Sequence, residues 1–563
     1  MQFTATSKSL RPARVPTIAA YSVAFWIILP LVIAWSSLTL DEATNSHLLS
    51  GTIFVILGLL IAVPSASLLL ISLRDFISQS GELPVSALQP PVLAQAGMYS
   101  WWRHPIYLFY DLTFVGAALA CRSDFMTFVT VTLLPAAILI YVWFEERALV
   151  RRFGDEYVSY KRRTPLIVPH LQTVLRIPSL IVFKFLFRFS VSGTEKIPAK
   201  PPFFIVSAHS SYIDPFFIGH CTTFPVSFVT TYEVFRSYFS RLIFGKFFCI
   251  TRKRFLPDVG TAKEISRAIR DRCVVVIFPE GERTWTGKMG PFKPEVVRLL
   301  KHFSDIPVVP VRIDGNYRAF PRWRKTIERR KVTVTACDPI FPGNLSGDAS
   351  IEYKLRMILE PHNPEETRLP DVSGMERVIY RCPGCSSFDS LSSAGRGRLA
   401  CSICHAVLKI SPDFSILMET HGAETKLSLH DMYEGIRIKP ADVKQLRPDK
   451  PPDKFPGVRE PAIAISGNCE YSNGDGTILT RRGEARLVLT DSSLFAARRP
   501  HPDAMPLPDI SSVTIESNNK LQVYDYRTGM LWQFRFNAES ALKWQDLINE
   551  TVHVRFNRKI NLN

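Results

Sequence analysis

For its 563 residues the chain has few cysteines and a shortage of acidic side chains. Its ten cysteines are too sparse for a secreted disulfide framework, which indicates a reducing compartment. Asp and Glu number 51 against 68 Lys and Arg, which gives a formal net charge of +17. Such an excess favours an anionic partner: a membrane surface, a phosphate-bearing substrate or nucleic acid.

Three motifs that mark many catalytic sites are also missing. The sequence has no G-x-G-x-x-G dinucleotide loop, no phosphate-binding P-loop and no serine nucleophile elbow. A dinucleotide cofactor and serine-based acyl chemistry therefore have no motif to support them. The length allows about three or four domains.

Apolar residues make up 46% of the chain and are concentrated near its beginning. Four apolar stretches cover residues 16–38, 51–72, 106–121 and 125–144. A helix needs about 20 residues to cross a bilayer core, so the first, second and fourth are long enough. The third is short and fits a tilted or partly buried span. The first has too long an apolar core for a cleaved signal peptide, so we expect a true span.

Basic residues flank this apolar block at both ends, whereas Asp41 and Glu42 follow its first span. By the positive-inside rule, both termini and the large remainder of the chain lie on the cytoplasmic side. Arg122, in a short outer loop, is a minor exception. We therefore expect an integral membrane protein with cytoplasmic catalytic domains. The flanking cations are Lys8, Arg11, Arg14, Arg147, Arg151, Arg152, Lys161, Arg162 and Arg163.

Two polar clusters lie on the expected cytosolic side of the block. One is the run Gly97-Met-Tyr-Ser-Trp-Trp-Arg-His-Pro-Ile-Tyr107. The other is Glu145-Glu146, followed by Phe153-Gly-Asp-Glu-Tyr157 and Tyr160. Taken alone, the residues also fit interfacial anchors beside an aromatic belt and the start of a solvated helix.

In this order the two clusters resemble the isoprenylcysteine carboxyl methyltransferase and phospholipid methyltransferase family, over residues 50–170. That family carries G-x-Y-x-x-x-R-H-P-x-Y, then two acidic residues before L-x-x-x-F-G-x-x-Y-x-x-Y. One departure is the bulky pair Leu108-Phe109, where a small residue is expected after the tyrosine. The resemblance implies that S-adenosylmethionine binds near Arg103, His104, Tyr107, Glu145 and Glu146.

A histidine and an aspartate are separated by four residues in the run His209-Ser-Ser-Tyr-Ile-Asp214. The run follows a strand-like stretch, Phe203-Phe-Ile-Val206, and one helical turn would bring the carboxylate back to the imidazole. A hydroxyl that attacks a thioester must lose its proton, and a positioned imidazole accelerates this by roughly 10²–10⁴-fold. A carboxylate on the other ring nitrogen fixes the tautomer. The pair predicts His209 as general base and Asp214 as its orienter, although this spacing alone is also common by chance.

A second loop, Phe278-Pro-Glu-Gly-Glu-Arg-Thr284, follows the apolar stretch that begins at Val274. Its glycine permits close backbone approach, and its arginine offers a two-donor fork to a phosphate. Three adjacent cations, Arg252-Lys-Arg254, lie upstream and fit either a phosphate or a membrane-facing patch. The loop therefore indicates a phosphate grip, with a plain charged turn as the alternative.

Together these runs resemble the PlsC-like glycerolipid acyltransferase family over residues 180–345. Its four blocks occur in order: His209 to Asp214, Gly245 to Arg252, Phe278 to Thr284, and Val308-Val-Pro-Val-Arg312. The resemblance implies acyl-CoA or acyl carrier protein as donor and a lysophospholipid or glycerol-phosphate hydroxyl as acceptor. Departures at Ala208, Glu282 and Pro294 bear on the identity of the acceptor. The acceptor-binding residues that the resemblance implies are Arg252, Glu280, Gly281, Arg283 and Thr284.

The same region alternates strands and helices. Strands near 203–207, 274–278, 307–313 and 331–336, with a helix near 293–303, predict an α/β domain with a mixed sheet. The segment 174–192 is apolar but carries Lys184 and Arg188, which favours a helix at the membrane surface.

Two Cys-x-x-Cys pairs follow, Cys382 with Cys385 and Cys401 with Cys404, fifteen residues apart. Four thiolates from two tight turns close a tetrahedral site and predict a structural zinc ribbon, with iron or dithiol redox chemistry as the alternatives. Residues 457–563 then alternate like strands and end in a helix near Ala538. This pattern resembles a PH or GRAM-like barrel that binds a lipid head group or a protein, or else a small β-domain without a ligand.

The expected fold is multidomain: an α-helical membrane bundle, an α/β acyltransferase domain, a zinc ribbon and a C-terminal β-barrel capped by a helix. The expected function is a membrane-bound O-acyltransferase of phospholipid synthesis with a linked methyltransferase-like module. The alternatives are a lipid or isoprenylcysteine methyltransferase and a non-catalytic membrane scaffold. The lipid-type motifs argue against a nucleic-acid partner despite the basic charge. The predicted parts are 1–172 (membrane), 173–345 (acyltransferase), 346–375 (linker), 376–410 (ribbon), 411–456 (linker) and 457–563 (barrel).

Overall fold

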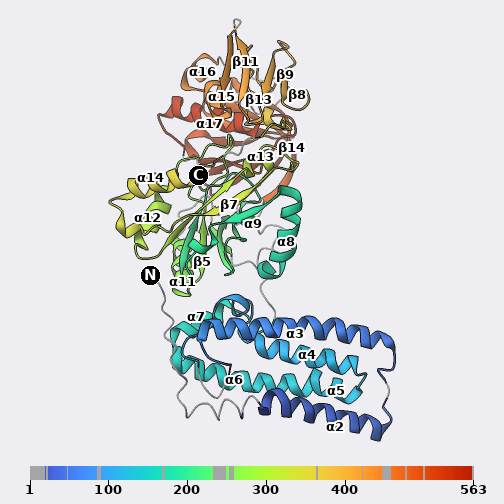
Figure 1. Ribbon diagram of the computed structural model, residues 1–563. Helices are drawn as coiled ribbons and strands as arrows, with labels where there is room; N and C mark the ends of the chain where they lie inside the picture. The colour runs from blue at the N-terminus through green and yellow to red at the C-terminus, as the bar shows by residue number, and fades with distance from the viewer. Residues whose placement is uncertain are drawn as a thin grey trace.

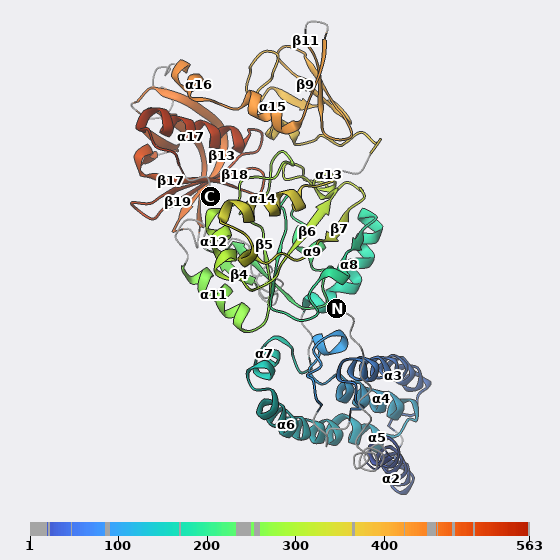
Figure 2. The same ribbon diagram turned by 60° about the vertical axis from the view of Figure 1, so that its left-hand side comes forward.

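Three parts follow one another along the chain in the structure, a computed structural model (Figures 1 and 2). A bundle of apolar helices comes first, an α/β part follows, and β-rich segments complete the chain. The structure describes residues 20, 23–46, 48–84, 90–167, 171–231, 249–252, 259–362, 366–420, 423–446, 458, 460–475, 479–498 and 501–560.

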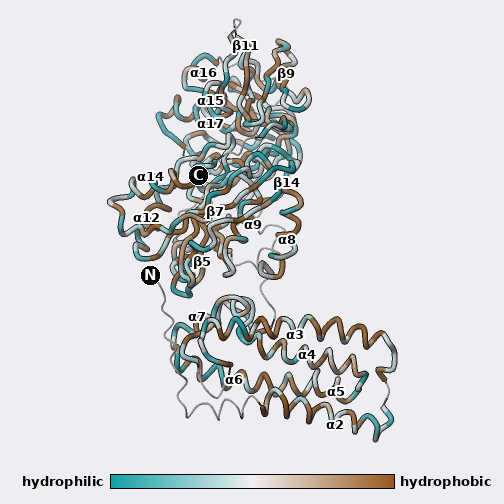
Figure 3. Tube along the Cα trace, viewed as in Figure 1, coloured by the Kyte–Doolittle hydropathy of each residue, from teal (hydrophilic) through white to brown (hydrophobic). Residues whose placement is uncertain are grey.

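The first part contains 3 helices that are long and apolar enough to cross a membrane, Ala24–Thr44, Thr52–Ser80 and Asp124–Phe153. Helix α4 (Pro105–Ala120) is apolar but shorter. Three long apolar segments and one short one are thus confirmed within the described residues, and Figure 3 shows them as a mostly hydrophobic bundle. The first of them comprises a π-helical turn and α2 (Leu29–Thr44), the second is α3 (Thr52–Ser80), and the third runs through α5 (Asp124–Phe128), a second π-helical turn and α6 (Leu134–Phe153), before α7 (Asp155–Arg163).

Glycines allow α3 and α4 to pack backbone against backbone. A Cβ at Gly58 of α3 would lie 2.3 Å from the amide nitrogen of Ala120, and one at Gly116 of α4 would lie 2.4 Å from that of Ala62. Small residues at such a crossing are typical of helices in lipid, where close van der Waals packing drives association. The crossing fixes α4, which begins directly after His104.

The middle part is a seven-stranded sheet in the order β1-β7-β6-β2-β5-β3-β4. Neighbouring strands are parallel except β6 and β7, so the sheet is mixed, as the alternating sequence pattern predicts. Its strands are β1 (Ser190–Ser192), β2 (Phe203–Val206), β3 (Val226–Thr231), β4 (Cys249–Arg252), β5 (Val274–Ile277), β6 (Val308–Asp314) and β7 (Thr333–Ala336).

Helices cover both faces of this sheet, because successive strand residues point to opposite sides. Phe203 and Ile205 of β2 pack in one core with α8 and α9, whereas Phe204 and Val206 pack in another with α11, α12 and α14. The strands are therefore apolar on both faces and leave polar loops at their ends. The helices are α8 (Leu171–Phe187), α9 (Asp214–Ile218), α11 (Val259–Arg270), α12 (Pro294–His302), α13 (Asn316–Ala319) and α14 (Asp348–Leu359).

The last part contains two antiparallel sheets. A five-stranded sheet has the order β12-β11-β10-β9-β8, and a seven-stranded sheet has the order β16-β15-β14-β13-β19-β18-β17. The closing helix α17 (Ala541–Phe556) buries Leu542, Trp544, Leu547 and Ile548, the face that the sequence predicts. Closure of the larger sheet into a barrel stays a prediction.

The strands of this last part are β8 (Leu391–Ser393), β9 (Arg398–Cys401), β10 (Val407–Ile410), β11 (Ile416–Thr420), β12 (Ala423–Leu427), β13 (Ala462–Gly474), β14 (Leu479–Thr490), β15 (Ser493–Ala497), β16 (Asp503–Pro506), β17 (Ile510–Glu516), β18 (Lys520–Asp525) and β19 (Leu531–Arg535).

Two segments expected as linkers contain regular structure. Within 346–375, α14 buries Ile351, Leu355 and Leu359, a stripe spaced by four residues that the Pro-, Gly- and Asp-rich composition conceals. Within 411–456, β11 and β12 belong to the five-stranded sheet, α15 (Leu429–Ile436) contacts β12, and α16 (Pro440–Gln445) contacts α17. Composition alone is a poor guide here, because short buried elements need only a few apolar positions.

Candidate active sites and metal site

Three loops that leave adjacent parallel strands meet at one edge of the middle sheet. The order of these strands is β6-β2-β5, and all three end at this edge. The His209 loop follows β2, the Phe278–Thr284 loop follows β5, and Asn316 follows β6. Carboxyl ends of parallel strands are where open α/β sheets form their binding crevices.

His209 and Asp214 are in hydrogen-bond contact, as the sequence predicts. The imidazole Nδ1 lies 3.0 Å from Asp214 Oδ2, and the same oxygen accepts hydrogen bonds of 2.8 Å from the amides of Ser210 and Ser211. Asp214 is fully buried, whereas 19% of the His209 side chain remains exposed. With Nδ1 bonded to the carboxylate, Nε2 is the nitrogen left for a substrate hydroxyl.

Asn316 completes this arrangement and was not found from the sequence. Its Nδ2 donates a buried hydrogen bond of 2.7 Å to Asp214 Oδ1. Gly315, with φ of 83°, makes the turn after β6 that places Asn316, and a Cβ there would lie 2.1 Å from the Lys331 carbonyl oxygen. Both carboxylate oxygens of Asp214 therefore have hydrogen-bond partners. A buried carboxylate without them would cost free energy of folding.

Glu280 ties the second loop to the first. Its Oε1 accepts the amide of His209 at 2.8 Å, and its Oε2 accepts the amide of Gly290 at 2.8 Å. Burial raises the pKa of Glu280 to about 7, against the opposing effect of these two amides. The Thr284 amide in turn donates to the His209 carbonyl oxygen at 3.0 Å, so the two loops hold each other in register.

Arg283 contacts a residue of the His209 loop, Tyr212. Its guanidinium carbon is 3.2 Å from the centroid of the Tyr212 ring, a cation–π contact. Its Nη1 is buried and has no hydrogen-bond partner among the described residues. Burial lowers the pKa of Arg283. A buried cationic donor without an acceptor is suited to an anionic ligand.

The other residues predicted to bind the acceptor are Arg252, Gly281 and Thr284, and their contacts differ. A Cβ on Gly281, where φ is 74°, would lie 3.7 Å from Arg252 Nη1, so Arg252 reaches the loop. The Thr284 hydroxyl instead donates to the Lys288 carbonyl oxygen at 2.7 Å. This is the geometry of a turn residue, and the contact of Thr284 with the acceptor stays a prediction. Gly245, Lys253 and Arg254 lie outside the described residues.

The surroundings of His209 favour its neutral form. Burial lowers the pKa of His209, Asp214 raises it, and Arg283 and Arg322 lower it further, with a net shift downward. The ring also stacks on Phe278, with centroids 4.1 Å apart. A neutral imidazole held by carboxylate and aromatic ring is the form that accepts a proton.

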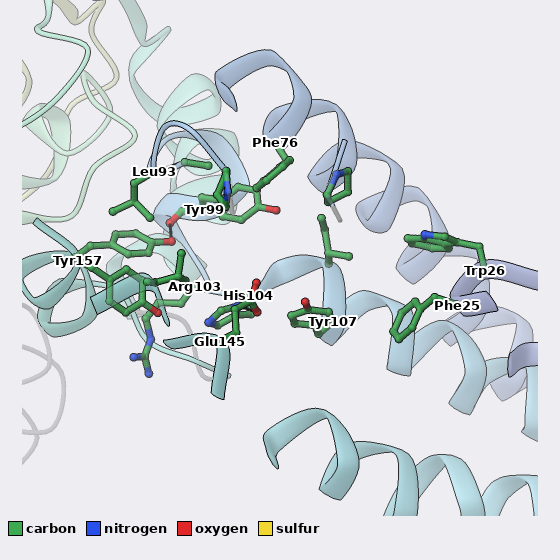
Figure 4. Close-up of a pocket in the computed structure, with 16 residues that line it drawn as sticks. Phe25, Trp26, Phe76, Leu93, Tyr99, Arg103, His104, Tyr107, Glu145 and Tyr157 are labelled. Carbon is green, nitrogen blue, oxygen red and sulfur yellow. Dashed lines mark hydrogen bonds and ion pairs between the residues drawn. The ribbon is translucent and has the colours of Figure 1, made fainter. Parts of the chain in front are cut away.

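A pocket lies in the membrane part, between α4, α6 and the loop after α3 (Figure 4). Arg103, His104, Tyr107 and Glu145 line it, and four of the five predicted cofactor residues thus share one cavity. Glu146 lies against it, with its Oε1 2.6 Å from Arg103 Nη1 and 3.7 Å from His104 Nε2. The His104 Nδ1 is 3.4 Å from Glu145 Oε2. Aromatic residues outside the predicted cofactor set also line the cavity: Phe25, Trp26, Phe76, Tyr99, Tyr157 and Tyr160.

The four cysteines of the two Cys-x-x-Cys pairs converge. Their sulfur atoms all lie within 4.8 Å of one another, with Cys382 Sγ and Cys404 Sγ 3.7 Å apart. Four thiolates at this spacing fit a tetrahedral zinc site without an open position. His405 follows the last cysteine with φ of 60° and is not part of this set.

Two separate segments of the chain match family models. Residues 188–314 match the model described as Acyltransferase, and residues 47–156 match the one described as Phospholipid methyltransferase. The first segment contains His209 and Asp214, and the second contains the Gly97–Tyr107 run and Glu145-Glu146 but ends before Tyr157. They support an enzyme with an acyltransferase domain and a methyltransferase-like domain in a membrane protein.

The curated relatives also fall into two groups, acyltransferases and methyltransferases. A 1-acyl-sn-glycerol-3-phosphate acyltransferase of Saccharomyces cerevisiae is 28% identical over 171 residues, which are 29% of this chain and 55% of that protein. Methanethiol S-methyltransferase 1 of Bradyrhizobium diazoefficiens is 35% identical over 85 residues, 15% of this chain and 29% of that protein. The chain therefore spans about half, or less, of the length of these relatives.

Among solved structures, the 1-acyl-sn-glycerophosphate (LPA) acyltransferase PlsC from Thermotoga maritima is 19% identical. The match covers 46% of this chain and 93% of that chain, with a TM-score of 0.30. This score is too low to support an argument, and the assignment rests on the sequence matches.

Proposed function

We propose that this chain is a membrane-bound O-acyltransferase that moves a fatty acyl group from acyl-CoA or acyl carrier protein to a lysophospholipid or glycerol-phosphate hydroxyl. One observation carries the proposal. The His209 imidazole is fixed by a buried carboxylate whose two oxygens are held by Asn316 and by backbone amides. The acyltransferase family match over residues 188–314, which include His209 and Asp214, supports it.

The reaction needs one base and no covalent enzyme intermediate. His209 Nε2 takes the proton of the acceptor hydroxyl while the hydroxyl oxygen attacks the thioester carbonyl carbon. The tetrahedral intermediate collapses, the carbon–sulfur bond breaks, and the imidazolium returns its proton to the departing thiolate. Asp214 stabilises the imidazolium and holds the ring tautomer throughout.

The acceptor's phosphate is expected to lie between Arg283 and Arg252. Arg283 has an unoccupied buried donor, and Arg252 reaches the same loop across Gly281. Two cations beside a mostly buried base suit a substrate whose phosphate and hydroxyl are close together, as in a lysophospholipid head group.

Acyl transfer to a panel of lysophospholipids and glycerol phosphate, in membranes that contain the chain, tests this proposal. His209→Ala is expected to abolish transfer from labelled acyl-CoA and to leave membrane insertion intact. The matched control is His302→Ala, because His302 is exposed at the end of α12. Wild-type turnover in His209→Ala would refute the assignment.

A second activity is favoured by the pocket of Figure 4. We propose that it binds S-adenosylmethionine, with Arg103, His104, Tyr107, Glu145 and Glu146 forming one side of the site. When bound, the cofactor would supply an electrophilic methyl group. The buried residues present fit it, because the carboxylates offer acceptors to an amino group and Arg103 a donor to a carboxylate. Isothermal titration with the detergent-purified chain and its Glu145→Gln variant tests binding, and no heat from the wild type would exclude it.

The rest of the chain has supporting roles in this proposal. The four cysteines hold a structural zinc ion, and the C-terminal sheets bind a protein or a lipid head group. Both termini and the catalytic parts face the cytoplasm, which the cations at both ends of the bundle support. Labelling of single introduced cysteines at residues 8 and 560 with an impermeant reagent in sealed cells tests this orientation.

A further inference from the structure

A short segment, Asn316–Trp323, joins the candidate acyl-transfer site to the C-terminal sheets. Asn316 bonds the Asp214 carboxylate at the site. Trp323, seven residues later, is fully buried in the same hydrophobic core as residues of β13, β17 and α17. Figure 2 shows the C-terminal sheet beside the middle part of the chain. The segment therefore contacts the candidate acyl-transfer site at its first residue and the C-terminal sheets, called the tail below, at its last residue.

Arg322 donates hydrogen bonds to the Phe278–Thr284 loop and to the C-terminal sheet. Its Nη1 donates to the Arg283 carbonyl oxygen at 2.8 Å and lies 3.3 Å from Glu282 Oε2. Its Nε donates to the Ser517 carbonyl oxygen at 3.1 Å and its Nη2 to that of Ile515 at 2.5 Å. Only 3% of its side chain is exposed, and a buried guanidinium bonded this fully holds its partners at fixed distances.

Tyr317 also bonds the chain directly after the Phe278–Thr284 loop, at Trp285. The Tyr317 hydroxyl donates to the Trp285 carbonyl oxygen at 2.6 Å and accepts from Trp323 Nε1 at 2.9 Å. Trp285 and Tyr317 both pack against the core that contains Trp323. Asn518, next to Ser517, donates to the Trp323 carbonyl oxygen at 3.4 Å. Residues 282–285 thus lie between the base and the tail, with bonds to both.

We propose that Arg322 is a positioning residue that sets Arg283 for the acceptor, using β17 of the C-terminal sheet as its fixed support. This inference rests on the proposed acyltransferase function. The tail then supports the acceptor site through Arg322, and the orientation of Arg283 depends on a strand more than two hundred residues downstream in the sequence.

A kinetic double-mutant cycle in the full-length, membrane-reconstituted chain tests the inference. Arg283→Ala is expected to raise the KM for the lysophospholipid acceptor about tenfold or more, through loss of a charge-assisted bond. Arg322→Gln should raise the same KM and leave the KM for acyl-CoA unchanged. In the Arg283→Ala background it should have no further effect, because it acts through that residue. Arg322→Lys, which keeps the charge without the fork, should be intermediate.

The matched control is Arg558→Gln. Arg558 also donates to a β17 carbonyl oxygen, that of Ile510, at the other end of the strand. It should leave the acceptor KM unchanged. Tyr317→Phe removes the hydroxyl that bonds both the Trp285 carbonyl oxygen and Trp323 Nε1, and it should reproduce the acceptor-specific effect while it keeps the ring.

Hydrogen–deuterium exchange separates this inference from the proposed function. Arg322→Gln should speed exchange of the amides of residues 281–288, and Arg558→Gln should not. If the wild type transfers no acyl group, the proposed function fails, and the exchange result still decides whether Arg322 holds the loop. Unchanged exchange at 281–288, or KM effects of Arg322→Gln and Arg283→Ala that multiply, would overturn the inference.

Discussion

Asn316→Ala removes a hydrogen bond on which the candidate base depends. The amide donates at 2.7 Å to Asp214 Oδ1, and the carboxylate is fully buried. A bond between a buried charge and a neutral donor is worth about 1.5–3 kcal/mol. Since about 1.4 kcal/mol is a factor of ten, the expected fall in kcat is about 10- to 150-fold. The acceptor and donor KM should not change, because Asn316 touches neither proposed substrate position.

The assay is acyl transfer at saturating acyl-CoA with varied acceptor, on variants reconstituted at equal protein content. Asn344→Ala is the control, because Asn344 is exposed on the same part of the chain. Circular dichroism and thermal unfolding show whether the variant folds. A folded Asn316→Ala variant with wild-type kcat would refute the reasoning that Asp214 needs this donor, as would a change confined to KM.

Three further outcomes are expected. The surroundings of His209 shift its pKa below the ordinary 6.5, so kcat/KM should still exceed half of its plateau value at pH 6.5. A pH–rate profile with its acid midpoint above 6.5 would contradict this. Gly116→Val should lower the thermal stability of the membrane bundle, because its Cβ would lie 2.4 Å from the amide nitrogen of Ala62 in α3. Gly435→Ala, which has open space around it, should not lower the stability. Equal melting temperatures for the two variants would count against the close helix crossing. Cys401→Ser should abolish the zinc content measured by mass spectrometry of the purified chain, and Cys121→Ser, outside the cluster, should retain it; zinc retained in Cys401→Ser would argue against the four-thiolate site.

The sequence predicted those features that local chemistry determines. The apolar runs before His209 and Phe278 became β2 and β5, because a strand buried on both faces has almost no choice but continuous apolar residues. The His209 and Asp214 contact follows from one turn of chain. The four cysteines converge as their spacing indicates.

Features set by distant contacts were missed. Asn316 follows a strand far along the chain, and only the parallel pairing of β6 with β2 brings it to Asp214. The contact of Arg322 with β17 has no sequence signal, since a single arginine carries no spacing pattern. The role of Thr284 at the acceptor stays a prediction; its hydroxyl donates to the Lys288 carbonyl oxygen in the same loop.

The shared core at Trp323 determines where the chain can be divided for expression. A recombinant fragment that stops at residue 345 would end the acyltransferase part as the sequence delimits it, yet leave Trp323 without the tail that buries it. Such a fragment would expose a large apolar surface and aggregate. A cut between α7, which ends at Arg163, and α8, which begins at Leu171, is better placed, because the middle part and the tail then stay together.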